Sequence, residues 1–356
     1  MLRFGGAARR LWCGLALLYS HALLAQAPKE KEEPKVAPLF ASHDTVPMTI
    51  SADFRAISKD KDTLNPKTYP AVLVAPSADG KVDTLKIDLS LRGHFRRSRL
   101  GCDVPPLRVR FSKDAKEERK GTLFKGQSSL KLITHCNTKS KDFEQYILQE
   151  YLVYRIYNLL TDVSFRARLV HMTYRQSGDT GSIATRFGFF IEDDDKMAKR
   201  NGGTLDKTQG ATWEDLKPET GTRLSVFEYF IGNTDWSLPY LHNIRLVRRE
   251  GGPFDAAPYD FDWSGVVNAK YAFPDYRLPI KSVRQRLYRG ACRSAQDLAP
   301  VFEQFRAQRE AIYQLYRSTP GLDPGQLKST LQYYDDFYRL LDSPGKVRDE
   351  FAGACS

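Results

Sequence analysis

The sequence has few cysteines and only one long apolar run, and both scarcities limit what the protein can be. Five cysteines occur in 356 residues, and no two of them have the close spacing of a zinc knuckle or a thioredoxin-like motif. A structural zinc site and dithiol redox chemistry are therefore not expected. Beyond the N-terminal segment, no stretch is long and apolar enough to span a membrane. The chain also carries no internal repeat.

The composition is that of a folded, basic protein. Hydrophobic residues make up 41% of the chain and charged residues 27%, enough to bury a core in one large or two modest domains and to rule out global disorder. Lysine and arginine total 54 against 43 acidic residues, a formal net charge of +11. Charge alone is compatible with nucleic acid, but no dedicated motif accompanies it. Nucleic acid is therefore not an expected partner.

Residues 1–27 have the order of charge and apolarity that characterises a signal peptide. Arg3, Arg9 and Arg10 precede the apolar run 11–24, and Ala25-Gln26-Ala27 offers small residues where a signal peptidase cuts. An uncleaved anchor would need about 20 apolar residues, and this run is shorter. We predict cleavage after Ala27, no membrane span after cleavage, and a secreted or periplasmic protein of unknown oligomeric state.

Four cysteines remain after such cleavage, namely Cys102, Cys136, Cys292 and Cys355. An oxidising compartment permits up to two disulfides among them, in one of three pairings. The spacing does not choose between these pairings.

The rest of the chain divides into a linker, a β-rich part and a helical part. Residues 28–45 are charged and proline-rich and are expected to form a disordered linker. Residues 46–195 hold short β-prone runs between turn signals, and residues 196–356 are mainly helical. The expected strands are MTISADFRAI, AVLVA, DTLKIDLSLRG, LRVRFS, SLKLIT, RLVHMTY and TRFGFFIE, and the expected helices of the second part are 223–231, 294–316 and 326–341.

One helix is predicted inside the β-rich part, over residues 143–160. This segment has no glycine or proline, and Asp142 precedes it as a candidate N-cap. Its apolar residues cover most of the helix circumference. A helix that is apolar on several sides is normally buried.

Site-like polar residues concentrate between Gly232 and Gly265. Asp235 and Asn243 lead into the strand IRLVRR, and a turn then returns the chain to PYDFDW, where Asp260 and Asp262 flank a phenylalanine. If the two runs form a hairpin, Asp235, Asn243 and one of the later aspartates converge at one end. Carboxylate and amide oxygens suit Mg²⁺, and a separate Asp can orient a hydroxyl nucleophile, as phosphoryl transfer requires. Each of these residues alone is more typical of a cap or turn.

Several motifs occur together in a fixed order. They are LSLRG followed by basic residues, PLRVRFSKD, LFKGQSSLKLIT, ILQEYLVYRIYNLL, RLVHMTY, GFFIED, NTDW and PYDFDWSG. Between about Leu85 and Gly265, roughly half the chain, this order resembles the CotH family of spore-coat kinases. The resemblance implies an α+β, atypical protein-kinase-like two-lobed fold, with a β-rich N-lobe that contains one buried helix and a helical C-lobe that contains the catalytic hairpin.

The resemblance also implies an activity and roles for the residues of the hairpin. The activity is Mg²⁺-dependent transfer of the γ-phosphate of ATP to Ser or Thr hydroxyls of a secreted or surface protein. Asp235 would be the catalytic residue that positions the acceptor hydroxyl, and Asn243 and Asp260 would be metal ligands. Asp262 would share or replace the role of Asp260, because residues two apart lie on the same side of a strand.

Further residues are expected to bind the nucleotide, and Glu150 is chosen among the helix acids because Ile147 and Tyr154 lie one turn either side of it. Lys131 would reach the phosphates and pair with an acid on the following helix, with Glu150 preferred and Glu144 the alternative. A basic cluster that includes Arg92 and Arg97 would hold phosphates or an acidic substrate. A solvated lysine and a solvated charge run are the structural alternatives.

The sequence departs from ordinary protein kinases in three respects. It lacks a GxGxxG loop and an HRD triplet, and the interval from Asp235 to Asn243 is longer than in typical protein kinases. These departures leave open an alternative function, a catalytically inactive kinase-like module for surface binding or adhesion.

Overall fold

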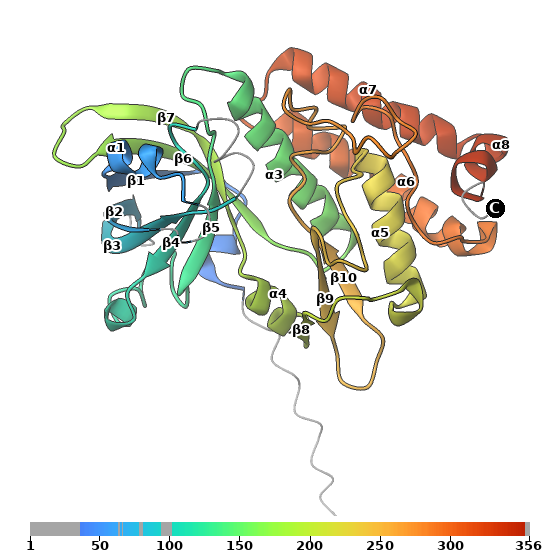
Figure 1. Ribbon diagram of the computed structural model, residues 1–356, viewed down its shortest axis with the longest axis horizontal. Helices are drawn as coiled ribbons and strands as arrows, with labels where there is room; N and C mark the ends of the chain where they lie inside the picture. The colour runs from blue at the N-terminus through green and yellow to red at the C-terminus, as the bar shows by residue number, and fades with distance from the viewer. Residues whose placement is uncertain (1–35, 63–64, 66, 78–80, 94–101, 353–356) are drawn as a thin grey trace, which may run out of the picture. The chain divides into compact units, whose positions relative to one another are not determined.

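The β-prone runs between Val46 and Ile191 form seven strands that close into a barrel (Figure 1). The structure is a computed structural model that describes residues 36–352, except 63–64, 66, 78–80 and 94–101. In the barrel the strands follow the order β1-β2-β3-β4-β5-β7-β6. They are β1 (Val46–Ala52), β2 (Thr68–Pro76), β3 (Val82–Leu91), β4 (Leu107–Phe111), β5 (Ser129–Ile133), β6 (Ala167–Gln176) and β7 (Ser182–Ile191).

The barrel closes where its first strand meets its sixth. β1 pairs with β6 in parallel, from Val46 opposite Val170 to Ala52 opposite Gln176. The other neighbouring strands pair antiparallel. Because the side chains of a strand alternate between its two faces, each strand sends every second residue inward.

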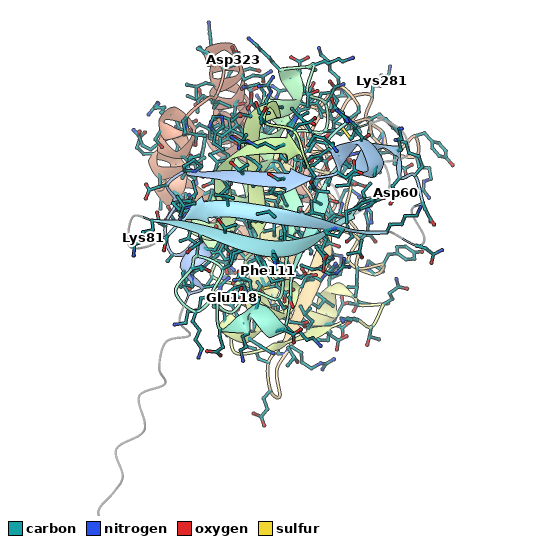
Figure 2. All side chains as sticks on the ribbon, turned by 90° about the vertical axis from the view of Figure 1, so that its left-hand side faces the viewer. Asp60, Lys81, Phe111, Glu118, Lys281 and Asp323 are labelled. Carbon is teal, nitrogen blue, oxygen red and sulfur yellow. A yellow bond between two sulfur atoms is a disulfide. The ribbon has the colours of Figure 1, made fainter. Side chains whose placement is uncertain are left out.

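Apolar side chains fill the interior of the barrel. Leu73, Val109 and Leu132, from three different strands, have no exposed surface. Figure 2 shows the barrel side of the molecule. Lys81 lies at the turn between β2 and β3, and Asp60 lies near the opposite ends of these strands. The interior is therefore a packed core.

Helices form a second core against the outside of the barrel. The long helix α3 (Asp142–Leu160) contacts β6 and β7 on one side and α6 (Ala295–Ser318) on the other. The helices α5 (Pro218–Ile231) and α7 (Pro324–Leu341) join the same apolar cluster. The predicted helix at 143–160 and its burial are confirmed. The short helices are α1 (Phe54–Lys59), α4 (Asp194–Arg200) and α8 (Pro344–Val347), with 3-10 turns at Pro38–Phe40, Asp114–Lys116 and Trp213–Asp215 and a π-turn at Arg348–Ala352.

The kinase-like fold is the expectation that the structure overturns. Because β1 pairs with β6, the strands make a closed seven-stranded barrel, which is not the N-lobe of a two-lobed kinase. One apolar cluster also joins Phe189 of the barrel to Phe230 of α5 and Tyr334 of α7. The prediction of an atypical protein-kinase-like two-lobed fold is therefore wrong.

The segment boundaries predicted from the sequence differ from the observed elements at three places. The border between 195 and 196 falls inside helix α4. In the described part of the 28–45 linker, Leu39 and Phe40 are buried against the barrel core. The run MTISADFRAI is not one strand, because the Asp53 side chain caps α1 and ends the extended stretch. The predicted signal peptide lies outside the described residues.

A second, three-stranded sheet carries the predicted hairpin. β9 (Ile244–Arg248) and β10 (Asp255–Pro258) pair antiparallel, and β8 (Thr204–Asp206) adds to the other edge of β9. The hairpin prediction is confirmed. Asp255, which flanks its turn, is buried between Lys217 and Arg249 and accepts a hydrogen bond from Thr220, so its role is structural.

Two further features bear on sequence predictions. Cys102 and Cys136 form a disulfide, and Cys292 is also disulfide-bonded. In the part of the chain that the structure describes, no helix has both the length and the apolar character needed to cross a bilayer.

Candidate functional site

The loop between α5 and β9 holds the first group of candidate residues. Helix α5 ends at Gly232, whose φ of 68° turns the chain away from the helix axis. A Cβ on Gly232 would collide with the hydroxyl of Tyr333, and the positive φ also favours glycine at this turn. The backbone N–H of Asp235 then donates to Asn233 Oδ1, at 3.0 Å. These contacts fix the position of Asp235 just beyond the end of the helix.

Asp235, His242 and Asn243 meet at the end of this loop. Ser237 and His242 exchange two backbone hydrogen bonds of 3.0 Å and so close the loop on itself. His242 Nε2 lies 3.0 Å from Asp235 Oδ1. Asn243 Nδ2 donates to Asp235 Oδ2 at 3.1 Å and to its backbone oxygen at 2.7 Å. The amide oxygen of Asn243 is therefore the atom that can bind a cation.

Backbone strain concentrates at the same place. Among the described residues other than glycine, five have positive φ, and three of these are Leu241, Asn243 and Asp260. The left-handed conformation is uncommon for Asn and Asp and is a clear outlier for Leu. Each such residue costs about 1–3 kcal/mol, and residues of this kind cluster at functional sites. The strain is a second indication of a site, independent of the side-chain chemistry.

Asp260 and Asp262 lie in different environments. Strand β10 ends at Pro258, and Asp260 is exposed beyond it with a φ of 64°. Its carboxylate interacts electrostatically with His242 and with Arg92. Asp262 is buried and accepts a hydrogen bond of 2.9 Å from the Tyr271 hydroxyl. Asp260 therefore interacts with the Asp235 group through His242, and Asp262 bonds to Tyr271.

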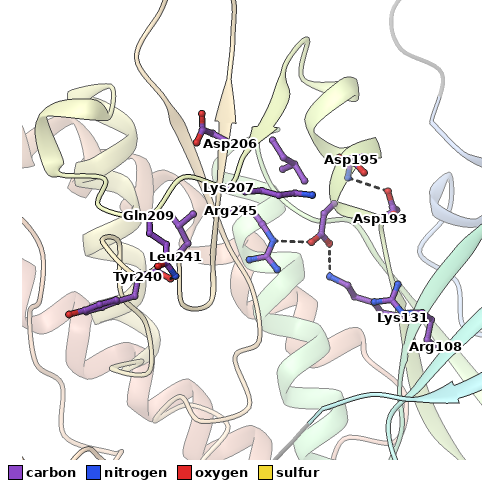
Figure 3. Close-up of a pocket in the computed structure, with 12 residues that line it drawn as sticks. Arg108, Lys131, Asp193, Asp195, Asp206, Lys207, Gln209, Tyr240, Leu241 and Arg245 are labelled. Carbon is purple, nitrogen blue, oxygen red and sulfur yellow. Dashed lines mark hydrogen bonds and ion pairs between the residues drawn. The ribbon is translucent and has the colours of Figure 1, made fainter. Parts of the chain in front are cut away.

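Four basic side chains and four aspartates line the cleft beside this group (Figure 3), and the aspartates are Asp193, Asp194, Asp195 and Asp206. Lys131 on β5 is paired in register with Arg108 on β4, so both side chains lie on one face of the barrel. Lys131 Nζ lies 2.5 Å from Asp194 Oδ1, and Arg245 Nε of β9 lies 2.9 Å from Asp194 Oδ2. The cleft has a volume of about 450 Å³, and Lys207 also lines it.

The predicted partner of Lys131 is not the one that the structure gives. Its ion pair is with Asp194, not with Glu150 of α3. Glu150 is fully buried and interacts electrostatically with Tyr154. The alternative acid, Glu144, accepts the backbone N–H of Phe187 at 2.8 Å, which is a structural role.

The basic cluster after β3 is only partly described. Arg92 is partly buried, and burial lowers its pKa while Asp260 acts in the opposite direction. Arg92 therefore reaches the candidate site from the barrel. Arg97 lies outside the described residues.

The electrostatics of the site favour charged side chains. The hydrogen bond that the His242 ring makes to the Asp235 carboxylate raises the pKa of His242, and Asp260 adds to the effect, although partial burial opposes it. Burial disfavours the charged carboxylate of Asp194, but Lys131 and Arg245 outweigh it and lower the pKa of Asp194. Burial raises the pKa of Glu228 to about 8, so this residue behind Asp235 is mostly protonated at neutral pH.

Oxygen atoms beside the cleft are of the kind that a magnesium nucleotide would need. No group of three or more His, Cys, Asp and Glu side chains with metal-site geometry occurs within the described ranges. Mg²⁺, however, is usually bound by one or two carboxylates together with phosphate oxygens and water. The Asp260 carboxylate and the Asn243 amide oxygen supply such a partial set, with Asp235 adjacent. The cations across the cleft match the phosphates.

Sequence analysis missed Asp194 and Arg245. The sequence did contain features that could have drawn attention to both residues. Asp194 belongs to an acidic run that follows the strand GFFIE, and Arg245 comes two residues after Asn243. Their meeting with Lys131 joins positions 63 and 51 residues apart in the chain. Local patterns do not report contacts at such separations.

Comparison with known proteins does not assign a family. No family model matches the chain, and no curated protein matches it. The resemblance to the CotH family therefore stays a prediction from the sequence motifs.

Proposed function

We propose that the protein transfers the terminal phosphoryl group of magnesium-bound ATP to a hydroxyl group of a secreted or surface protein. The observation that carries the proposal is the meeting of Asp235 and Asn243, with Asp260 close by, at the edge of a cleft whose charged lining includes Lys131 and Arg245. Carboxylate and amide oxygens on one side and fixed positive charges on the other are what phosphoryl transfer needs. The proposal rests on the site, since one fold hosts many functions.

Asp235 is assigned to the acceptor hydroxyl. In the reaction the hydroxyl oxygen forms a bond to the γ-phosphorus, the bond from that phosphorus to the bridging oxygen breaks, and ADP leaves. The hydroxyl proton passes to the Asp235 carboxylate and then to solvent. Asn243 holds this carboxylate through the hydrogen bond to Oδ2 and so fixes its orientation.

The phosphates are assigned to the basic side of the cleft. Lys131 and Arg245 present positive charge from the barrel and from the second sheet, and Arg92 adds charge near Asp260. Fixed cations stabilise the charge that develops on phosphate oxygens in the transition state. Magnesium, held by Asp260 and Asn243, would neutralise further phosphate charge when bound.

Phosphoryl transfer by the purified chain without residues 1–27 tests the proposal. We expect Mg²⁺-dependent labelling of its own hydroxyls from γ-labelled ATP, reduced at least 100-fold in Asp235→Asn. The matched control is Asp179→Asn, an exposed aspartate that pairs with Arg55 of α1. This control is expected to keep wild-type activity and thermal stability.

Two results would contradict the proposal. Full activity in Asp235→Asn would remove the assignment of that residue. A wild-type protein that neither transfers phosphate nor shows a thermal shift with Mg-ATP would favour the catalytically inactive binding module.

A further inference from the structure

Asp194 bridges the two parts of the protein that face each other across the cleft. One carboxylate oxygen contacts Lys131 on barrel strand β5, and the other contacts Arg245 on β9 of the second sheet. The side chains of Lys131, Asp194 and Arg245 are 13%, 20% and 27% exposed. A carboxylate in such a position is held by two charge-assisted hydrogen bonds and only partly screened by water.

The two cations are built into the cleft and are not mobile surface charges. Both cations lie against the ring of Tyr259, whose centroid is 5.5 Å from Lys131 Nζ and 4.3 Å from the Arg245 guanidinium carbon. Arg245 Nη1 also donates to its own strand, to the oxygen of Ile244. Cations fixed and partly buried in this way need an anion between them, because unpaired buried charge is costly.

One carboxylate does not balance the positive charge at this point. Asp194 faces two cations, and Arg108 lies beside Lys131 in the register of β4 and β5. The neighbouring acid Asp195 lines the same cleft but forms no ion pair with these cations among the described residues. Asp193 and Asp206 also line the cleft, but Asp193 caps α4 and Asp206 pairs with Arg248. Among the described ion pairs, Asp194 is therefore the one carboxylate that Lys131 and Arg245 share.

We propose that Asp194 occupies the place of a phosphate group, and that a polyphosphate enters the cleft by displacing this carboxylate from Lys131 and Arg245. Asp194 then acts as a built-in competitor that sets the affinity of the cleft. A tethered carboxylate is present at high effective concentration, so a single phosphate competes poorly. A polyphosphate succeeds because it contacts several cations at once. That the physiological polyphosphate is ATP rests on the proposed function.

Binding of inorganic triphosphate, without magnesium or nucleoside, tests the inference. Asp194→Asn is expected to bind triphosphate at least tenfold more tightly than the wild type, as measured by calorimetry. Asp195→Asn makes the same charge change in the same cleft and is expected to stay within about threefold. Adding Lys131→Met to Asp194→Asn should abolish the gain. Unchanged or weaker triphosphate binding by Asp194→Asn would overturn the inference.

Stability provides a second readout if the substitution harms folding. Asp194→Asn and the smaller Asp194→Ser leave two cations unpaired, so both should melt earlier than the wild type. Triphosphate should then raise their melting temperatures more than that of the wild type. If both variants fail to fold even with triphosphate, the carboxylate has a role that phosphate cannot take, and the inference is wrong.

The inference and the proposed function fail in different ways. Tighter triphosphate binding in Asp194→Asn, with no phosphoryl transfer by the wild type, would overturn only the proposed function. Normal transfer with no gain in triphosphate binding would overturn only the inference.

Discussion

The interior of the barrel and the cleft beside it are built from opposite kinds of side chain. Leu73, Val109 and Leu132 in the barrel are fully buried and apolar. The cleft holds Lys131, Asp194 and other charged groups that stay partly exposed. The side chains that stabilise the fold and the side chains proposed to take part in phosphoryl transfer therefore lie in different regions. Substitutions in the two regions should therefore affect stability and activity separately.

The largest effect is expected from a cavity in the barrel. Phe190 on β7 is fully buried, and its ring contacts that of Phe124. Phe190→Ala should lower the free energy of unfolding by about 3–5 kcal/mol, because it loses apolar burial and leaves a void. Urea unfolding measures the change, and activity per folded molecule should not change. The control is Tyr276→Ala, because the side chain of Tyr276 is 93% exposed. This substitution should change the free energy of unfolding by less than about 0.5 kcal/mol. Equal losses in both variants would contradict the comparison.

The next effect separates two aspartates that are two residues apart. Asp260→Asn should reduce phosphoryl transfer by about 100-fold, roughly 2.7 kcal/mol, with little change in melting temperature. Asp262→Asn should lower the melting temperature and leave the activity of the folded protein near normal, because the buried carboxylate bonds to Tyr271. Activity assays and thermal melts on both variants check this contrast. The reverse pattern would make Asp262 the metal ligand.

A smaller effect should come from the buried histidine next to the barrel core. His135 is fully buried against the ring of Tyr174, and burial lowers its pKa to about 4. The folded state therefore favours the neutral imidazole, and stability is lost as the pH falls from about 6.5 toward 4. The loss from this residue is about 2–3 kcal/mol by pH 4.5.

His135→Leu tests that pH dependence. The variant should lose less stability than the wild type between pH 7 and pH 4.5 in urea unfolding. Burial also lowers the pKa of His43 to about 4. The variant should therefore keep part of the wild-type dependence of stability on pH. An unchanged slope in His135→Leu would show that His135 does not titrate in this range.

The smallest effect concerns the acidic side of the activity profile. The pKa of His242 is raised, so the ion pair with Asp235 is complete below pH of about 6.5 and disappears as the pH rises through the raised value. If Asp235 receives the acceptor proton as proposed, a charged His242 competes for the same carboxylate. Activity should therefore increase with pH through this pKa.

His242→Gln keeps a hydrogen-bond donor but does not titrate. The ratio of activity at pH 6 to activity at pH 8 should rise severalfold in this variant. A pH profile identical to that of the wild type would exclude His242 as the controlling group.

Local patterns predicted much of the fold and the centre of the site. The strands, the buried helix α3 and the β9–β10 hairpin follow from short-range periodicity and turn residues. Asp235 and Asn243 are joined by one loop of the chain, so their meeting was also predictable. Such features depend on contacts within a few residues or within one hairpin.

The remaining features depend on contacts that no local pattern reports. The barrel closes between strands whose paired residues, such as Val46 and Val170, are far apart in sequence. The sequence could not distinguish Asp260 from Asp262, because both were expected to lie on one strand. In the structure β10 ends at Pro258, and Asp260 has a left-handed backbone conformation. The Asp194 bridge likewise joins residues of β5 and β9 that lie 63 and 51 residues from Asp194 in the chain.

The parallel pairing of β1 with β6 has a consequence for how the chain is made. During synthesis β1 emerges long before the partner that covers its second edge, and loop closure over such a distance is slow. Until Ala167–Gln176 has appeared, the early strands present an open edge that other chains can join. A nascent or truncated chain that stops before β6 should therefore aggregate, and holding it extended until β6 is complete would protect it.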